Sequence, residues 1–286
     1  NTIRFFPDKK GLASGLITGG MGGAAIIAAP IANALIERYG VSQAFWRMGL
    51  AYALVGFFFS LFIRSAPKQI VPQTAATSEK APTKAITANK NWKEMLATPA
   101  FYLLILMFAM GAFSGLMIAS NASLIGQSMF GLSASAAAAY VSLYSLSNTS
   151  GRVFWGAVSD RIGQIRAVII IYSAIIFAFV LLVSVNQVWA FAVGIVTLGL
   201  CFGGVMGVFP GLVMDNFGPA NQGVNYGIVF IGVSPKVPAS LAAANNGDFT
   251  NAFYVAIAVV LIGLGLSLVY AKRKADAVEA AVETIQ

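Results

Sequence analysis

The sequence predicts an all-α, polytopic helical membrane protein. Of its 286 residues, 58% are hydrophobic and only 10% are charged, and the mean hydropathy is +0.79. A chain with so many hydrophobic and so few charged residues cannot fold as a soluble protein with one buried core and a polar surface. Mostly apolar runs of roughly 20 residues, each long enough as a helix to cross a hydrocarbon layer of about 30 Å, recur between short polar breaks. The roughly ten-residue alternating segments of a transmembrane barrel are absent, so the spans are expected to be helices.

Eight apolar runs are expected to form membrane spans. They cover residues 11–36, 43–64, 99–126, 134–158, 166–185, 188–213, 222–244 and 250–271. Residues 67–95, rich in Pro, Ala, Thr and Lys, form the one long break and are expected to be a flexible cytoplasmic linker. Two spans precede this linker and six follow it. If six spans are the natural unit, four further helices are expected in front.

The positions of Lys and Arg predict the orientation in the cell membrane. Cytoplasmic loops carry the excess of basic residues. With eight spans both chain ends share one side, which holds 14 of the 18 basic residues, against Arg38 and Arg47 on the other. Both ends are therefore expected to be cytoplasmic, and this topology accounts for the net charge of +8. Because the basic residues are spread over several loops, nucleic-acid binding is not expected.

Missing residue types narrow the chemistry. The chain has no histidine, which removes His-based proton relays, His triads and the common zinc motifs. Its single cysteine, Cys201, cannot form an intrachain disulfide. No phosphate-binding loop is present, so ATP coupling, a cofactor and a metal are not expected. Asp215 and Asp248 are expected in loops, and no Asp or Glu lies in the middle of an expected span. This pattern favours anion exchange or passage over proton symport.

Arg152 is a cation inside the expected span 134–158. It precedes Asp160 by eight residues, which places it about 12 Å into the membrane at the rise of an α-helix. A charge at that depth costs several kcal/mol or more unless it is compensated, and an anionic substrate would compensate it. The alternative is that Arg152 snorkels to the interface or binds a carbonyl of a neighbouring helix. The residues that share its helix face, and are expected to line a wet cavity, are Tyr144, Asn148, Trp155 and Ser159.

Lys236 is a second cation within an expected span, 222–244. It lies about 21 Å along the helix axis from the cytoplasmic start of that span. Two cations facing one cavity would suit a dianion or two monoanions. Asn148 and Tyr226 lie on or beside the two cationic helices, and their amide and hydroxyl groups are candidate hydrogen-bonding partners of a carboxylate. The alternative is that such Asn and Tyr side chains bridge neighbouring helices.

Glycines recur at every fourth residue in two of the expected spans. This spacing leaves one helix face without side chains, so that the backbone of a neighbouring helix can approach closely. Static packing is one interpretation, and sliding of smooth helix faces during a transport cycle is the other. The glycines are Gly11, Gly15, Gly19 and Gly23 in the first span and Gly199, Gly203, Gly207 and Gly211 in the sixth.

The loop after the fourth span carries the pattern G-x-x-x-D-R-x-G. Its positions are Gly156, Asp160, Arg161 and Gly163. The pattern resembles the signature between paired helices of major facilitator superfamily transporters. A carboxylate at a helix end can pair with an Arg or cap the next helix, and so latch two helices on the cytoplasmic side. A plain solvated turn is the alternative.

Several segments together resemble the oxalate:formate antiporter family within that superfamily. They read FFPDKKGLASGLITGGMGGAA, NWKEMLATPAFYLL, SNTSGRVFWGAVSDRIG and NYGIVF. The resemblance implies a major facilitator fold of twelve helices in two six-helix lobes, of which this chain matches helices five to twelve. The implied domains are 1–66 (the last two helices of the N-terminal lobe), 67–95 (the central linker), 96–274 (the C-terminal lobe) and 275–286 (a cytoplasmic tail).

The resemblance also implies a substrate site. Arg152 stands where these relatives carry an Arg in helix eight that binds the substrate carboxylate. The family's Lys in helix eleven falls at Val233 when counted from the NYG motif, so Lys236 matches it only approximately. Lys236 is then expected either to reach the site from the next turn or to gate the outer vestibule.

The expected function is secondary transport of small organic carboxylates, by exchange and alternating access between two lobes. The expected partners are carboxylate anions, the lipid bilayer and N-terminal helices of the same protein. One alternative is a proton-coupled monocarboxylate symporter. Another is a membrane sensor or scaffold that does not transport, in which both cations would be structural.

Overall fold

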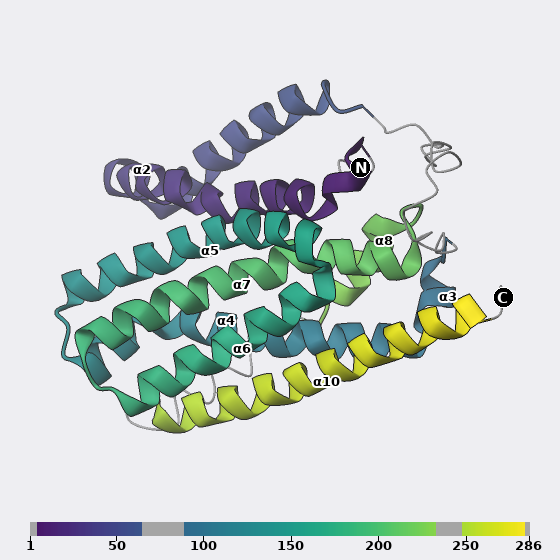
Figure 1. Cartoon of the computed structure of the whole chain (residues 1–286). Helices are drawn as coiled ribbons and strands as arrows, with labels where there is room; N and C mark the ends of the chain where they lie inside the picture. Colours follow the sequence, from purple (N-terminus) through teal and green to yellow (C-terminus); the bar gives the residue numbers. More distant parts are fainter. Residues whose placement is uncertain (1–4, 65–88, 233–247, 284–286) are drawn as a thin grey trace.

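The computed structural model is a bundle of long helices that run side by side (Figure 1). It describes residues 5–64, 89–232 and 248–283. No strand occurs in these three ranges, which confirms the all-helical class there. The elements in chain order are η1 (Pro7–Lys9), α2 (Lys10–Ser60), α3 (Trp92–Leu96), α4 (Pro99–Phe130), α5 (Ala134–Ile162), α6 (Gln164–Ser184), α7 (Val188–Phe217), α8 (Gln222–Phe230) and α10 (Thr250–Glu283).

Four helices match expected membrane spans in both position and character. In the described part of the chain, α4, α6, α7 and the stretch Thr250–Asp276 of α10 are long and apolar enough to cross a membrane, by length and composition alone. They correspond to the spans expected from residues 99, 166, 188 and 250. The other four expected spans stay predictions.

α7 lies at the centre of the bundle. Its side chains are buried without interruption from Cys201 to Met214, and it packs against α2, α4, α5 and α6. Three glycines of its stripe face the backbone of α5, because a Cβ atom built on Gly199, Gly203 or Gly207 would meet α5 main-chain atoms. Close backbone approach of this kind is the main source of helix association in lipid, where burial of apolar surface supplies little driving force.

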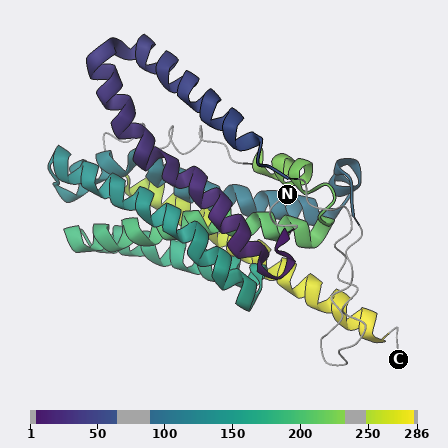
Figure 2. The ribbon, with the colours of Figure 1, turned by 90° about the horizontal axis from the view of Figure 1, so that it is seen from above.

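α2 contains two of the expected spans and is bent between them. Gly40 has a φ of +78° and a ψ of 165°. This backbone conformation interrupts the helix, and residues other than glycine rarely adopt it. The residues before Gly40 cross over the bundle, whereas those after it turn away (Figure 2). The second half is consequently exposed, with 73% of Phe45 and 68% of Phe57 accessible.

The end of the expected linker is structured. Asn91 accepts hydrogen bonds from the backbone N–H groups of Lys93 and Glu94, and Glu94 accepts one from the N–H of Asn91. This reciprocal capping box starts α3, whose Met95 is fully buried. Residues 89–95 therefore differ from the expected flexible linker, because a local cap and one buried side chain hold them. Residues 65–88 lie outside the described ranges.

Candidate functional site

Arg152 lies in the seam between α5, which carries it, and the first half of α2. It is half-buried. Its Nε donates a hydrogen bond to Oδ1 of Asn148 at 3.2 Å, and its Nη1 donates to the main-chain carbonyl of Thr18 in α2 at 2.7 Å. The guanidinium also passes over Gly22, where an added Cβ would stand 3.2 Å from Cζ. Arg152 thus connects the two helices that flank this seam.

The charge of Arg152 has no counter-ion in the described residues. No Asp or Glu there lies within ion-pair distance of it, and its two hydrogen-bond acceptors are neutral. A guanidinium has five N–H donors, so several remain for a further acceptor. The bond to Thr18 is the interhelical carbonyl contact that was the alternative to substrate binding, but it uses one donor and neutralises nothing. A cation so placed is stabilised when an anion binds beside it.

Two of the other predicted site residues lie beside Arg152. Asn148 is buried, and its Nδ2 has no hydrogen-bond partner among the described residues. Tyr226 of α8 lies close enough for its hydroxyl to interact electrostatically with Arg152, as does Tyr144 of α5. Lys236 falls outside the described residues. Of the other three predicted substrate residues, Asn148 is therefore bonded to Arg152 and Tyr226 lies within electrostatic range of it, and their role in substrate binding stays a prediction.

The polar face of α5 is packed rather than wet. Tyr144, Asn148, Trp155 and Ser159 are all buried. Tyr144 donates to the carbonyl of Gly115 in α4 at 2.6 Å, and Trp155 packs where Gly204 of α7 leaves room. The expectation that the whole face lines a cavity is wrong in this structure, because the α7 glycines let that helix close over it. Arg152 alone on this face stays half-exposed.

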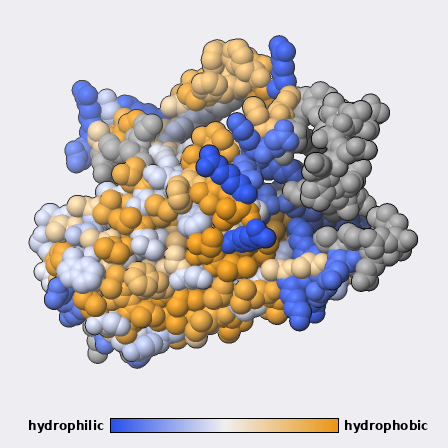
Figure 3. All heavy atoms as spheres, in the orientation of Figure 1, coloured by the Kyte–Doolittle hydropathy of each residue, from blue (hydrophilic) through white to orange (hydrophobic). Residues whose placement is uncertain are grey.

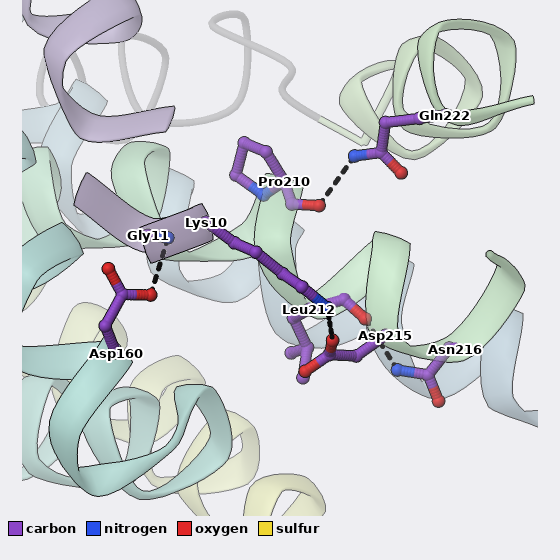
Figure 4. A network of polar contacts seen from close by, with 8 residues as sticks. All are labelled: Lys10, Gly11, Asp160, Pro210, Leu212, Asp215, Asn216 and Gln222. Carbon is purple, nitrogen blue, oxygen red and sulfur yellow. Dashed lines mark hydrogen bonds and ion pairs between the residues drawn. The ribbon is translucent and has the colours of Figure 1, made fainter. Parts of the chain in front are cut away.

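Asp160 of the G-x-x-x-D-R-x-G pattern forms a contact with α2 (Figure 4). Asp160 accepts hydrogen bonds from the backbone N–H groups of Gly11 at 2.7 Å and Leu12 at 2.9 Å. These donors belong to the first turn of α2, where N–H groups lack intrahelical partners and the helix dipole favours an anion. The expected cap on the next helix, α6, is thus corrected: Asp160 caps α2 instead.

The other positions of the pattern differ in what they contact. A Cβ on Gly156 would overlap the carbonyl of Gly11, so this glycine permits the helix contact. Gly163 ends α5 with a φ of +90°, a turn conformation that favours glycine. Arg161 is exposed, and no contact with another described residue explains its place in the pattern.

An ion pair that sequence reasoning missed holds the same end of α2. Lys10 Nζ lies 2.9 Å from Oδ1 of Asp215, whose side chain is 8% exposed. Asp215 was expected in a loop but lies in the last turn of α7. No local signal pairs two residues 205 positions apart. The start of α2 is therefore bound by carboxylates from both α5 and α7, as Figure 4 shows.

Comparison with known proteins shows the family to which this helical chain belongs. Residues 2–235 match the family described as the Major Facilitator Superfamily. The chain belongs to this superfamily. It is 33% identical over 234 residues to the uncharacterized MFS-type transporter YhjX of Escherichia coli (strain K12), covering 81% of this chain and 56% of that protein. It is 29% identical over 273 residues to the oxalate:formate antiporter of Oxalobacter formigenes, covering 92% of this chain and 62% of that protein.

The chain spans about three fifths of the length of these two relatives. Its helices accordingly form part of a major facilitator fold, and it is a multi-pass membrane protein of a transporter family. In such a protein the contact of Asp160 with α2 joins helices that the predicted domains assign to different lobes.

Replacing Asp160 with alanine is expected to destabilise this major facilitator protein modestly. Loss of a helix cap costs roughly 0.5–2 kcal/mol, which corresponds to a fall of a few degrees in apparent Tm for a protein of this size. Thermal unfolding of the purified full-length protein in detergent measures this change in Tm. Asp276→Ala is the control, since Asp276 is exposed on α10. Equal Tm values for the two variants would show that the cap contributes nothing.

Proposed function

We propose that the chain is the greater part of a secondary transporter that exchanges small organic carboxylates, oxalate- or formate-like, by alternating access. The observation that carries this proposal is the charge of Arg152 in the seam between α2 and α5, which has no counter-ion among the described residues. A guanidinium offers a planar pair of donors that matches a carboxylate. Transport rather than chemical conversion is proposed because the chain belongs to a transporter superfamily and no described Asp or Glu forms an ion pair with Arg152.

Asn148 and Tyr226 are proposed as the second and third substrate ligands. The unpartnered Nδ2 of Asn148 can donate to a carboxylate oxygen that Arg152 also binds, because its Oδ1 already accepts from Arg152. Tyr226 would donate from α8 and so connect a bound anion to a third helix. Lys236 is proposed as a further cation at the same site or at its outer gate.

Release and rebinding of the substrate are proposed to depend on whether the contacts between the start of α2 and its neighbours α5 and α7 are formed or broken. Asp160 and Lys10 hold the start of α2 at one end of the bundle. Opening of that end requires the two hydrogen bonds of the Asp160 cap and the Lys10–Asp215 ion pair to break. An anion bound at Arg152 would bias the equilibrium through its differential affinity for the two states. We propose that this end faces the cytoplasm, with residues 1–66 in one lobe and residues 96–274 in the other.

Exchange makes a direct prediction for the full-length protein in lipid vesicles. Uptake of labelled oxalate or formate is expected only when the vesicles contain a carboxylate, with little response to an imposed proton gradient. The described spans support this, since no carboxylate side chain lies near Arg152 to carry a proton. Uptake into empty vesicles driven by a proton gradient would instead identify a symporter. Neither uptake nor thermal stabilisation by any carboxylate would identify a sensor or scaffold.

A further inference from the structure

A cavity lies at one end of the bundle, away from Arg152. It occupies about 260 Å³ between the start of α4 and the C-terminal parts of α7 and α10. This volume is below the roughly 300–1,000 Å³ of pockets that enclose a drug-sized molecule, and it suits a smaller group. Its lining includes Leu103, Asp215, Asn216, Tyr270, Arg273 and Lys274.

The charge around this cavity is positive. Arg273 and Lys274 are exposed and form no ion pair with any described residue. The one carboxylate in the lining, Asp215, already faces Lys10 at 2.9 Å. An entering anion therefore meets two cations whose attraction the lining does not offset.

The inner wall adds polar groups in a defined arrangement. The hydroxyl of Tyr270 donates to Oδ1 of Asn216 at 2.6 Å, and Nδ2 of Asn216 donates to the carbonyl of Leu212 at 2.7 Å. The second N–H of that amide and the oxygen of Tyr270 remain able to bond a ligand. A ligand with both anionic oxygens and hydroxyl groups would match this lining.

Exposed apolar side chains lie on two of the helices that line the cavity, α4 and α10. On α4, Tyr102 and Leu106 are 56% and 47% exposed, and on α10, Leu268 and Val269 are 52% and 45% exposed. Figure 3 shows the broad hydrophobic flank, with hydrophilic residues over the C-terminal part of α10. Basic residues at the end of a spanning helix, beside lipid-facing side chains, lie at the level of lipid headgroups.

We propose that this cavity binds the headgroup of an anionic glycerophospholipid. Arg273 and Lys274 hold the phosphate, since a guanidinium and an ammonium both bind phosphate oxygens well. Tyr270 and Asn216 receive the hydroxyl groups of the headgroup. The acyl chains follow the exposed side chains of α4 and α10. The lining shares Asp215 with the Lys10 ion pair of the transport proposal, but the residues assigned to the lipid are separate from those assigned to the substrate, so either proposal can fail without the other.

Lipid-dependent stability of the full-length protein in neutral detergent tests the site. Phosphatidylglycerol is expected to raise the apparent Tm of the unaltered protein by several degrees more than phosphatidylcholine does. The double variant Arg273→Gln/Lys274→Gln is expected to lose at least half of that difference. Lys272→Gln removes a neighbouring exposed cation that does not line the cavity, and this control should retain the difference.

Two results would overturn the proposal. One is an equal response to phosphatidylglycerol in the double variant and the unaltered protein. The other is a matching rise in Tm with inorganic phosphate at the same concentration, which would identify a site for free anions. If the double variant fails to fold, Leu103→Phe provides a second route, because it narrows the cavity and keeps every charge. That variant should also lose the response, and a full response in it would reject the site.

Discussion

Replacing Arg152 with alanine is expected to abolish carboxylate exchange while the protein still inserts and folds. The substitution removes the cation at the α2 and α5 seam that is proposed to bind the substrate, together with the bonds to Thr18 and Asn148. A hydrogen bond to a charged group contributes roughly 1.5–3 kcal/mol, so loss of two such bonds to a carboxylate reduces binding by a factor of about 100 or more. Folding is spared because no partner charge is left buried without a counter-ion.

The design of this experiment separates charge from geometry. Arg152→Lys keeps the positive charge but loses the planar pair of donors and the reach to Thr18, so a residual activity of a few per cent is expected. Arg166→Ala, at the exposed start of α6, is the control for loss of a cation. Counterflow of labelled carboxylate in vesicles containing equal amounts of protein measures all three. Undiminished exchange by Arg152→Ala would remove the main support of the proposed function.

Replacing Gly15 with alanine is expected to weaken transport by about tenfold or more. A Cβ atom on Gly15 would overlap the carbonyl oxygen of Arg152, and this neighbour is backbone, which cannot turn aside. Overpacking of this kind costs typically 1–3 kcal/mol, and here the cost falls on the contact between α2 and α5. The helices must separate slightly, which draws Arg152 away from its partner Thr18.

The same helix offers a matched control for that steric effect. Gly20 is also in α2, but an added Cβ there meets nothing within 4 Å. Gly20→Ala should therefore leave transport intact, and the higher helix propensity of alanine, about 1 kcal/mol over glycine, favours the helix. Transport rates and apparent Tm of both variants in the full-length protein give the comparison. Equal transport by the two variants would contradict a role for close α2 and α5 contact.

The two glycine stripes meet the same helix. Gly15 and Gly19 of α2 face α5 at Arg152 and Val153, and Gly203 and Gly207 of α7 face it at Asn148 and Arg152. The contact with α7 lies within one predicted lobe and fits static packing. The contact with α2 crosses the predicted lobe boundary. Sliding of α2 along α5 during transport therefore stays a prediction, and Gly15→Ala tests whether close contact between these helices matters for transport.

Local features of the chain were readable from residue order alone. The membrane class and four of the spans follow from hydropathy, which involves only neighbouring residues. The presence of Arg152 in an apolar stretch is likewise visible without coordinates. The helical period also places Asn148 on the same face as Arg152, and the two are indeed hydrogen-bonded.

The partners of these residues were decided only by the tertiary structure. Every helix start presents the same unpaired N–H groups, so the sequence of the loop after α5 cannot say that Asp160 caps α2, 149 residues earlier at Gly11, rather than α6. For the same reason the sequence allowed a bond from Arg152 to a neighbouring helix carbonyl but could not say that Thr18 supplies it, and it gave no sign of the Lys10 and Asp215 pair. Which helices lie side by side depends on packing of the whole bundle, and α5 meets α2 and α7 because glycines remove the side chains that would keep them apart.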